Sequence, residues 1–122
     1  MARVDGTIIK INRGDVLNLT LNLTLDNGTA YTFQPGDVIV FSLYNKGALN
    51  KEAILLKTIT VSEERANLDI TLTSEETKIG DLINKPVDYW YEIELNNQYT
   101  VIGYDDDGAK ILTLFPEGSK VI

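Results

Sequence analysis

The stretch that decides the fold of this chain reads Leu17-Asn18-Leu19-Thr20-Leu21-Asn22-Leu23-Thr24-Leu25. Leucine occupies every odd position, and asparagine or threonine occupies every even one. Because successive side chains of a β-strand point to opposite faces, this alternation predicts a strand with its leucines in a core and its polar residues in water. At about 3.3 Å per residue the strand would be about 30 Å long, so we expect it to bend or to cross between two sheets.

Strand and turn signals continue on both sides of this stretch. Asp26-Asn27-Gly28 predicts a hairpin turn, because Asn and Gly tolerate the positive φ that such turns require. Asn12-Arg13-Gly14-Asp15 and Gln34-Pro35-Gly36-Asp37 predict two more turns. Thr73 and Glu76 have the spacing of a capping box, which predicts one short helical turn limited by Gly80. Further strands are predicted at 7–11, 29–33, 38–44, 53–61, 68–72, 87–95, 99–104 and 109–115.

The order of these elements predicts the fold class. Strands do not alternate with helices, and no linker or internal repeat interrupts the chain. We therefore expect residues 1–122 to form a single domain. Its predicted fold is all-β, an immunoglobulin-like antiparallel β-sandwich of about seven or eight strands with one short helical turn.

Two of the predicted strands depart from simple alternation. The strand at 38–44 is apolar on both faces, with Val38, Val40 and Tyr44 opposite the face of Ile39, Phe41 and Leu43. Such a strand is either central and covered on both sides or lies under a partner subunit. In the strand at 53–61, Lys57 interrupts the apolar face, and we expect a β-bulge near it.

Composition excludes several classes of function. The chain has no cysteine and no histidine, which removes disulfides, the usual zinc ligands, and the Ser-His-Asp and Cys-His catalytic constellations. A net charge of −7 opposes binding to a phosphate backbone, so we expect no nucleic-acid partner. The segment from Met1 to Gly6 lacks the apolar core of a signal peptide, and no apolar run has the length of a membrane span. We expect synthesis in the cytoplasm, with no membrane partner.

Several short motifs have simpler explanations than the chemistry they resemble. Arg13-Gly14-Asp15 spells an integrin-binding tripeptide but is typical of a tight turn. The glycosylation patterns that begin at Asn18, Asn22 and Asn27 follow from strand alternation and a turn. We expect all three asparagines to be unglycosylated.

Two acidic groups have features in common with chemical sites. Asp105-Asp106-Asp107-Gly108 could offer oxygens to calcium, but it lacks the spacing of the twelve-residue calcium loop and favours an acidic hairpin turn. Glu92 and Glu94 would lie about 7 Å apart on one strand face, a separation used by inverting glycosidases but also common on solvated strands. The sequence predicts no enzyme, no cofactor and no metal site.

The aromatic residues leave two interpretations open. Trp90 is the single Trp and shares the polar face of its strand with Glu92 and Glu94. It could close a second small core beneath a loop, or it could be an exposed anchor for a partner or a sugar ring. Tyr99 and Tyr104, on opposite faces of the next strand, allow the same two interpretations.

One ordered set of features resembles a known family. A turn at 13–15 leads into the alternating leucines, a Pro-Gly-Asp turn at 35–37 leads into Val-Ile-Val-Phe-Ser-Leu, and Leu-Asp-Ile-Thr-Leu-Thr-Ser-Glu-Glu-Thr at 68–77 precedes Tyr-Trp-Tyr-Glu-Ile-Glu-Leu at 89–95. This set, spread over residues 7–115, resembles the immunoglobulin-like N-terminal domain of baseplate upper proteins of tailed phages of Gram-positive bacteria, and related small virion domains. Those baseplate proteins continue into a long C-terminal part, whereas this chain stops just after Pro116-Glu117-Gly118.

The resemblance implies a non-enzymatic structural protein of a tailed-phage or prophage virion, made in the host cytoplasm. It implies an assembly or attachment module in the baseplate or tail, in the neck or on the head. Its expected partners are other virion proteins and further copies of itself. The partner interface is expected at Val38, Val40, Tyr44, Trp90 and Tyr104. The alternative is a carbohydrate-binding β-sandwich in which Trp90, Tyr99 and Tyr104 form an aromatic platform.

Overall fold

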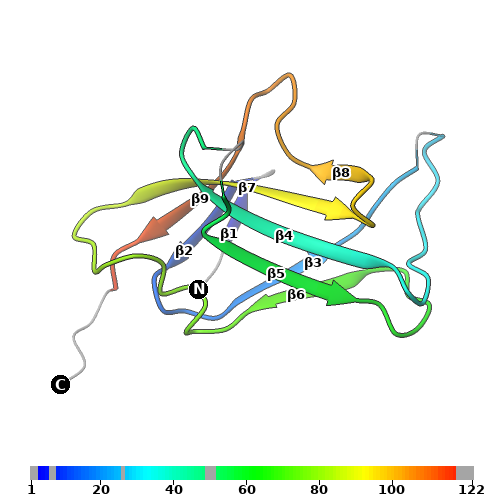
Figure 1. Ribbon diagram of the computed structural model, residues 1–122, viewed down its shortest axis with the longest axis horizontal. Coiled ribbons are helices and arrows are strands. Elements are labelled where there is room, and N and C mark those ends of the chain that lie inside the picture. Colours follow the sequence, from blue (N-terminus) through cyan, green and yellow to red (C-terminus); the bar gives the residue numbers. More distant parts are fainter. Residues whose placement is uncertain (1–2, 6–7, 26, 49–51, 118–122) are drawn as a thin grey trace.

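The computed structural model describes residues 3–5, 8–25, 27–48 and 52–117, and these residues form an all-β sandwich (Figure 1). The larger sheet has seven strands in the order β1-β2-β9-β7-β4-β5, and β8 also pairs with β7. The smaller sheet consists of β3 and β6. The bounds in the larger sheet are β1 Arg3–Asp5, β2 Ile8–Asn12, β4 Val38–Asn45, β5 Leu55–Thr60, β7 Val87–Leu95, β8 Tyr99–Ile102 and β9 Lys110–Phe115; those in the smaller are β3 Leu17–Leu21 and β6 Leu68–Leu72. The predicted fold class is confirmed.

Part of the strand order follows that of an immunoglobulin-type sandwich. Strands β9, β7, β4 and β5 lie in one sheet in the order of strands G, F, C and C′ of a variable-type sandwich, while β3 and β6 take the places of B and E. One pairing is not antiparallel as predicted, since β2 runs parallel to β9. Parallel pairing is available to these two strands because nearly the whole domain connects them along the chain.

The leucine strand is shorter than predicted. Strand β3 ends at Leu21, and the extension of the strand to Leu25 is wrong. Its partner β6 has only five residues, with Leu17 opposite Leu72 and Leu21 opposite Leu68. Beyond Leu21, the described residues of this stretch form an isolated bridge between Thr24 and Ala30 instead of a longer strand.

The hairpin after the leucine stretch is present, although Asp26 lies outside the described residues. The amide of Leu25 donates to the carbonyl of Thr29 at 2.7 Å, and the amide of Tyr31 donates to the carbonyl of Leu23 at 2.9 Å. Residues 29–33 form isolated bridges rather than the predicted strand, because Phe33 pairs with Arg65 instead of continuing along the hairpin.

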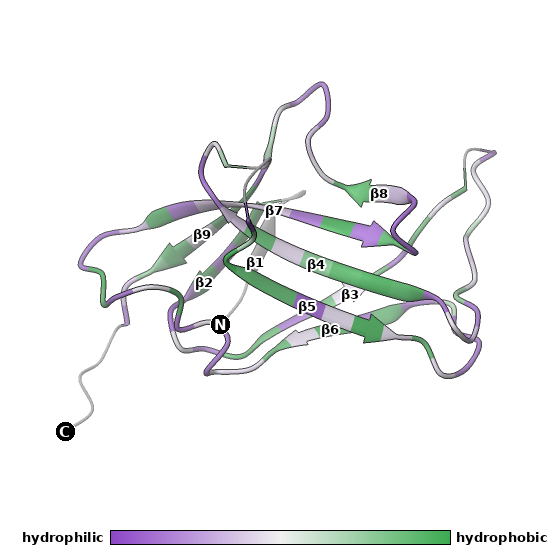
Figure 2. Ribbon diagram, in the orientation of Figure 1, coloured by the Kyte–Doolittle hydropathy of each residue, from purple (hydrophilic) through white to green (hydrophobic). Residues whose placement is uncertain are grey.

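Strand β4 lies between β5 and β7 in the larger sheet, as expected of a central strand. Its Ile39, Phe41 and Leu43 are fully buried against the smaller sheet, and Phe41 stacks on Tyr91 with ring centroids 5.6 Å apart. Figure 2 shows β4 as hydrophobic along most of its length. Its opposite face is only half covered, so the larger sheet has a buried inner face and an open outer face.

Lys57 does not cause a bulge, and that prediction is wrong. Strand β5 keeps an unbroken register with β4, in which Lys57 lies opposite Phe41 on the inner side. Because β5 is the last strand of its sheet, the Lys57 side chain can extend past the core to the carboxylate of Glu76, 3.0 Å away. The register shift lies instead between Ile93 and Glu94, where β7 pairs with β8.

The predicted capping box forms a single helical turn. The amide of Thr73 donates to the Glu76 carboxylate at 2.9 Å, and the amide of Glu76 donates to the Thr73 hydroxyl at 3.2 Å. The backbone N–H of Thr73, followed by Lys57, holds the pKa of Glu76 below its usual value. This turn contacts the Arg13-Gly14-Asp15 turn at one end of the sandwich.

The Arg13 turn is structural. Gly14 has a φ of 88°, and the Arg13 guanidinium donates to the carbonyls of Ile79 and Gly80 and pairs with Glu117. The buried Thr77 hydroxyl accepts from the amide of Gly14 and donates to the carbonyl of Asp15. We call residues 12–15, 73–80 and 117 the pinned end.

Candidate interaction surfaces

The outer face of the larger sheet carries an apolar row that crosses four neighbouring strands. Tyr44 of β4 lies opposite Trp90 of β7, and Trp90 lies opposite Ile111 of β9. In the parallel register of β2 with β9, Ile8 comes next in line. Tyr44, Trp90 and Ile111 are half-buried and Ile8 is exposed. We call these four residues the outer row.

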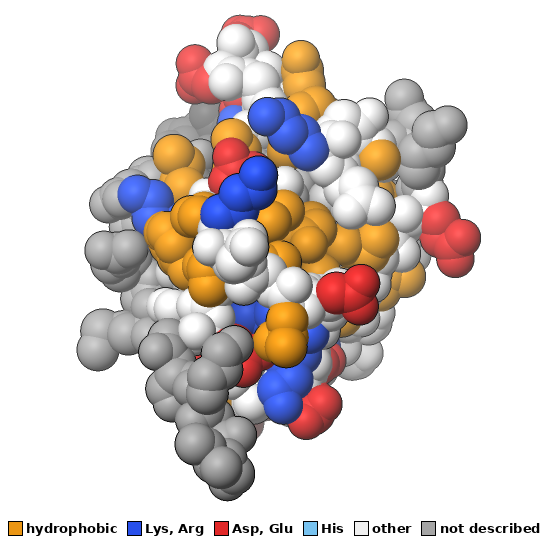
Figure 3. Space-filling model, turned by 90° about the vertical axis from the view of Figure 1, so that its left-hand side faces the viewer, with side chains coloured by type: hydrophobic (Ala, Val, Ile, Leu, Met, Phe, Trp, Pro, Cys, Tyr) orange, Lys and Arg blue, Asp and Glu red, His pale blue; other side chains and the backbone are white. Residues whose placement is uncertain are grey.

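Other apolar side chains border the outer row. Leu56 of β5 and Ile54 just before it are exposed large hydrophobic residues. Figure 3 views the end of the molecule at the left of Figure 1, where β7 begins and β9 ends. Hydrophobic side chains gather in the middle of that face, with charged side chains around them.

Trp90 is partly covered by a loop and partly accessible, so each of the two interpretations, a small core and an exposed anchor, holds in part. Strand β8 ends at Ile102, and the chain then brings Tyr104 to the Trp90 ring, with centroids 6.2 Å apart and planes tilted by 59°. Tyr104 itself remains 62% exposed. The aromatic pair therefore covers one side of Trp90 and leaves an accessible aromatic surface.

The five residues predicted for the interface fall into two groups. Tyr44, Trp90 and Tyr104 come together, as register and ring contact show. Val38 and Val40 are half-buried on the same face but lie at the other end of β4, where Val40 is opposite Glu94. The outer face thus joins an aromatic group to a smaller aliphatic one along a single strand.

An acidic pair lies on β7 beside the outer row. Glu92 and Glu94 are half-buried on the same face as Trp90, and Glu92 lies opposite the buried Ser42. Burial, and then the charge of Glu94, raise the pKa of Glu92 above its usual value. A cation placed near this pair would relieve the repulsion between the two carboxylates.

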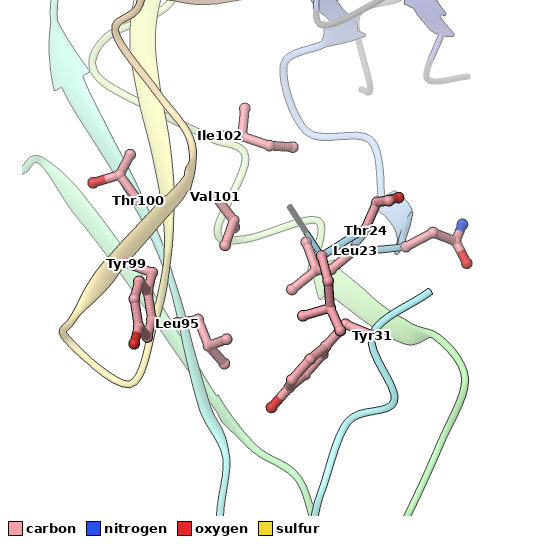
Figure 4. Close-up of a pocket in the computed structure, with 10 residues that line it drawn as sticks. Leu23, Thr24, Tyr31, Leu95, Tyr99, Thr100, Val101 and Ile102 are labelled. Atoms are coloured by element: carbon pink, nitrogen blue, oxygen red, sulfur yellow. The ribbon is translucent and has the colours of Figure 1, made fainter. Parts of the chain in front are cut away.

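Tyr99 does not join the aromatic group on the outer face. It lies opposite Leu95, whose side chain is buried in the core, so Tyr99 belongs to the inner side of the larger sheet. Its side chain, 61% exposed, lies at a cleft (Figure 4). The three aromatics of the sugar-platform interpretation therefore do not form one surface.

This cleft lies at the end of the sandwich opposite the pinned end, and we call it the open end. It has a volume of about 660 Å³, with Tyr99 and Val101 of β8 on one side and Leu23 and Tyr31 on the other (Figure 4). The Tyr31 hydroxyl donates to the Asp37 carboxylate at 2.6 Å. That hydrogen bond is the main cause that raises the pKa of Tyr31 to about 12. Sequence reasoning missed the cleft, because no local motif marks the place where a strand loses its neighbour.

A second cleft of about 340 Å³ continues along β3. Leu19 and Ile70 of the smaller sheet line it from one side, and Tyr91 and Ile93 of β7 line it from the other. Asn22 and Ile102 line both clefts, so the two are neighbours.

The acidic segment near residue 105 forms a tight turn. Asp105 and Gly108 pair across it, and the Lys110 ammonium lies 2.6 Å from the Asp105 carboxylate. Lys110, and then the amide of Asp107, hold the pKa of Asp105 below its usual value. Within the described segments, no group of three or more Asp, Glu, Cys or His residues is arranged to hold a metal ion. The described residues also include no helix with the length and apolarity needed to cross a membrane.

The chain has no significant match to a protein-family model, to a curated protein sequence or to a solved structure. Its function therefore has to be argued from its own residues and surfaces.

Proposed function

We propose that this protein is a non-enzymatic assembly module of a tailed-phage or prophage virion. It attaches other virion proteins in the baseplate or tail, in the neck or on the head. The observation that carries this proposal is the outer row of Ile8, Ile111, Trp90 and Tyr44, an apolar line across the open face of the sheet. The resemblance of residues 7–115 to phage baseplate domains supplies the class of particle.

The outer row has the composition of a protein–protein contact. Trp and Tyr are enriched where partners bury their surfaces, and a contiguous apolar patch on a domain of this size favours a docking surface. At about 4.8 Å between neighbouring strands, the row extends about 15 Å, which is sufficient for the centre of a standard interface.

The charges beside the outer row favour a partner of a particular kind. Glu92 and Glu94 border Trp90, and the whole chain carries a net charge of −7. A partner surface with an apolar centre and Lys or Arg opposite these glutamates would pair with the carboxylates and could stack a cation on Trp90. Self-association in a ring or trimer would place the row against a different patch of the next copy.

The sugar-binding alternative has weaker support. Its platform needs stacked aromatic rings on one surface, and Tyr99 lies on the inner side of the sheet from Trp90. Trp90 and Tyr104 remain as a tilted pair.

The direct test is the composition of the particle. In a lysogen that encodes this chain, we expect induced and purified particles to contain the protein in a fixed ratio to a tail, neck or head protein, measured by quantitative mass spectrometry. Particles that assemble fully and lack the chain would contradict the proposal.

Variants locate the docking surface. Trp90→Glu and the more exposed Leu56→Glu should each remove the protein from the particles, because a carboxylate would be desolvated in an apolar contact. Leu82→Glu, in an exposed position on the loop before β7, is the matched control and should leave incorporation unchanged. Light scattering of the purified protein tests self-association separately. If the protein stays monomeric at high concentration, self-association is rejected, and docking on another protein is still possible.

A further inference from the structure

In the part of the chain that the structure describes, no strand of the larger sheet lies on the outer side of β8. Strands β8 and β9 pair with successive parts of β7 along the same edge, since the other edge of β7 is occupied by β4. Strand β2 covers β9 on its far side. Among the described residues, no strand covers β8 in the same way. The backbone N–H and C=O groups along its outer edge are therefore left to water or to a partner.

A strand added on the outer edge of β8 would direct side chains of one face toward the two clefts. Ile9, near the start of β2, lines the second cleft, and Val101 and Tyr99 of β8 line the first. Leu19 of β3 and Leu23, just beyond the end of β3, are both half-buried and line the clefts on the side of the smaller sheet. A strand in line with β2 would thus close the gap between the two sheets at the open end.

The residues that line the two clefts indicate what kind of segment would bind there. Not one of the described residues that line the two clefts is charged, although charged residues make up 24% of the chain. A charged side chain of the occupant placed among these described residues would lose its hydration without finding a charged partner among them. Alternate apolar side chains would instead pack on Leu23, Val101 and Ile93.

We propose that the free edge of β8 binds an extended, uncharged segment of a partner protein, which adds a strand parallel to β8. The backbone of the segment pairs with residues 99–102, and every second side chain enters the clefts. This inference does not depend on the proposed function, because it concerns the edge of β8 and the inner side of the sheet, whereas the proposed function rests on the outer row.

The test uses synthetic peptides of nine residues in which Val, Ile or Leu alternates with Thr, with charged residues only at the termini for solubility. Binding is followed by amide NMR signals and by hydrogen exchange of the protein. We expect members of the set to protect amides within residues 99–102 and to shift the signals of Leu23 and Val101. A peptide N-methylated at alternate positions should bind at least about tenfold more weakly, equivalent to about 1.4 kcal/mol, because it cannot form the backbone hydrogen bonds.

Two exposed residues give the matched variants. Tyr99 and Leu82 are 61% and 67% exposed, but Tyr99 lies at the cleft, and Leu82 lies on the loop before β7 and lines neither cleft. Tyr99→Lys should weaken peptide binding several-fold, and Leu82→Lys should leave it unchanged. Because both side chains are exposed, thermal unfolding should confirm that both variants are folded.

Several outcomes would overturn the proposal. These are no binding by any peptide at its solubility limit, equal binding of the N-methylated peptide, equal effects of the Tyr99 and Leu82 variants, and signal changes confined to Tyr44 and Trp90. Pairing of a second copy of the chain on the edge of β8, seen as concentration-dependent protection of the same amides, would also reject a separate partner. Failure here would leave the outer row and its particle test untouched.

Discussion

The two ends of the leucine stretch lie in different environments. Leu17 is next to the pinned end and is 0% exposed, whereas Leu25 at the open end is 47% exposed. At the pinned end, the side chains of Arg13 and Thr77 satisfy the backbone groups of the neighbouring turns. At the open end, the chain passes beyond the reach of β6 and leaves a cleft.

This difference shows that alternation of leucine with polar residues decides which face of the strand the leucines occupy. It does not decide whether that face is buried. A leucine on the inner face is buried only where a second sheet lies opposite and a neighbouring strand covers its flank. The residues of the stretch share one pattern, and their burial follows their neighbours in space. A well-packed region such as the pinned end stabilises the fold, and a less packed region such as the open end is available for binding.

The largest expected effect separates the two ends of the stretch directly. Leu17→Ala should lower the free energy of unfolding by about 2–5 kcal/mol, because it removes buried methyl groups and leaves a cavity. Leu25→Ala should change it by no more than about 0.5 kcal/mol, as expected of an exposed site. Urea unfolding of both variants measures the difference. Equal losses would show that the open end is as well packed as the pinned one.

A smaller effect tests the pinned end alone. Thr77 is 1% exposed, and its hydroxyl accepts from the Gly14 amide at 3.1 Å and donates to the Asp15 carbonyl at 2.7 Å. Thr77→Val keeps the shape but removes both of these buried hydrogen bonds, so we expect a loss of about 1–3 kcal/mol. Thr58→Val, at an exposed position on β5, is the control and should be nearly neutral. Similar urea midpoints for the two valine variants would mean that the turn contacts contribute little.

The smallest effect concerns the open end and depends on pH. The amide of Gln34, then the hydroxyl of Tyr31, hold the pKa of Asp37 below its usual value. A carboxylate with a lowered pKa in the folded state stabilises the protein above its unfolded pKa of about 3.9, and this stability is lost as the pH falls through the folded pKa. Tyr31→Phe should therefore cost about 1 kcal/mol near neutral pH and progressively less below about pH 4.

Thermal unfolding of Tyr31→Phe and of the native protein across this pH range gives the measurement. Tyr104→Phe serves as the control, because Tyr104 is exposed on the outer face and should show no such pH dependence. A constant difference between Tyr31→Phe and the native protein at every pH would contradict a role for the Asp37 carboxylate.

The candidate surfaces were only partly predictable. The sequence placed Tyr44 and Trp90 on outward faces of their strands, and the register then set them opposite each other. Nothing local indicated that Tyr104 would leave its strand and meet Trp90, or that Tyr99 would turn to the inner side. Those positions depend on where β8 ends and how the chain returns to β9.

The sequence by itself determined the inward and outward faces of the strands, the turns and the capping box, because these depend on side-chain alternation and on φ preferences within a few residues. Only the tertiary structure decided where β3 ends, where Lys57 finds its partner and which edge stays open. The physical reason is that a strand needs a neighbour to receive its hydrogen bonds. Here that neighbour, β6, lies about fifty residues away along the chain and has only five residues to offer.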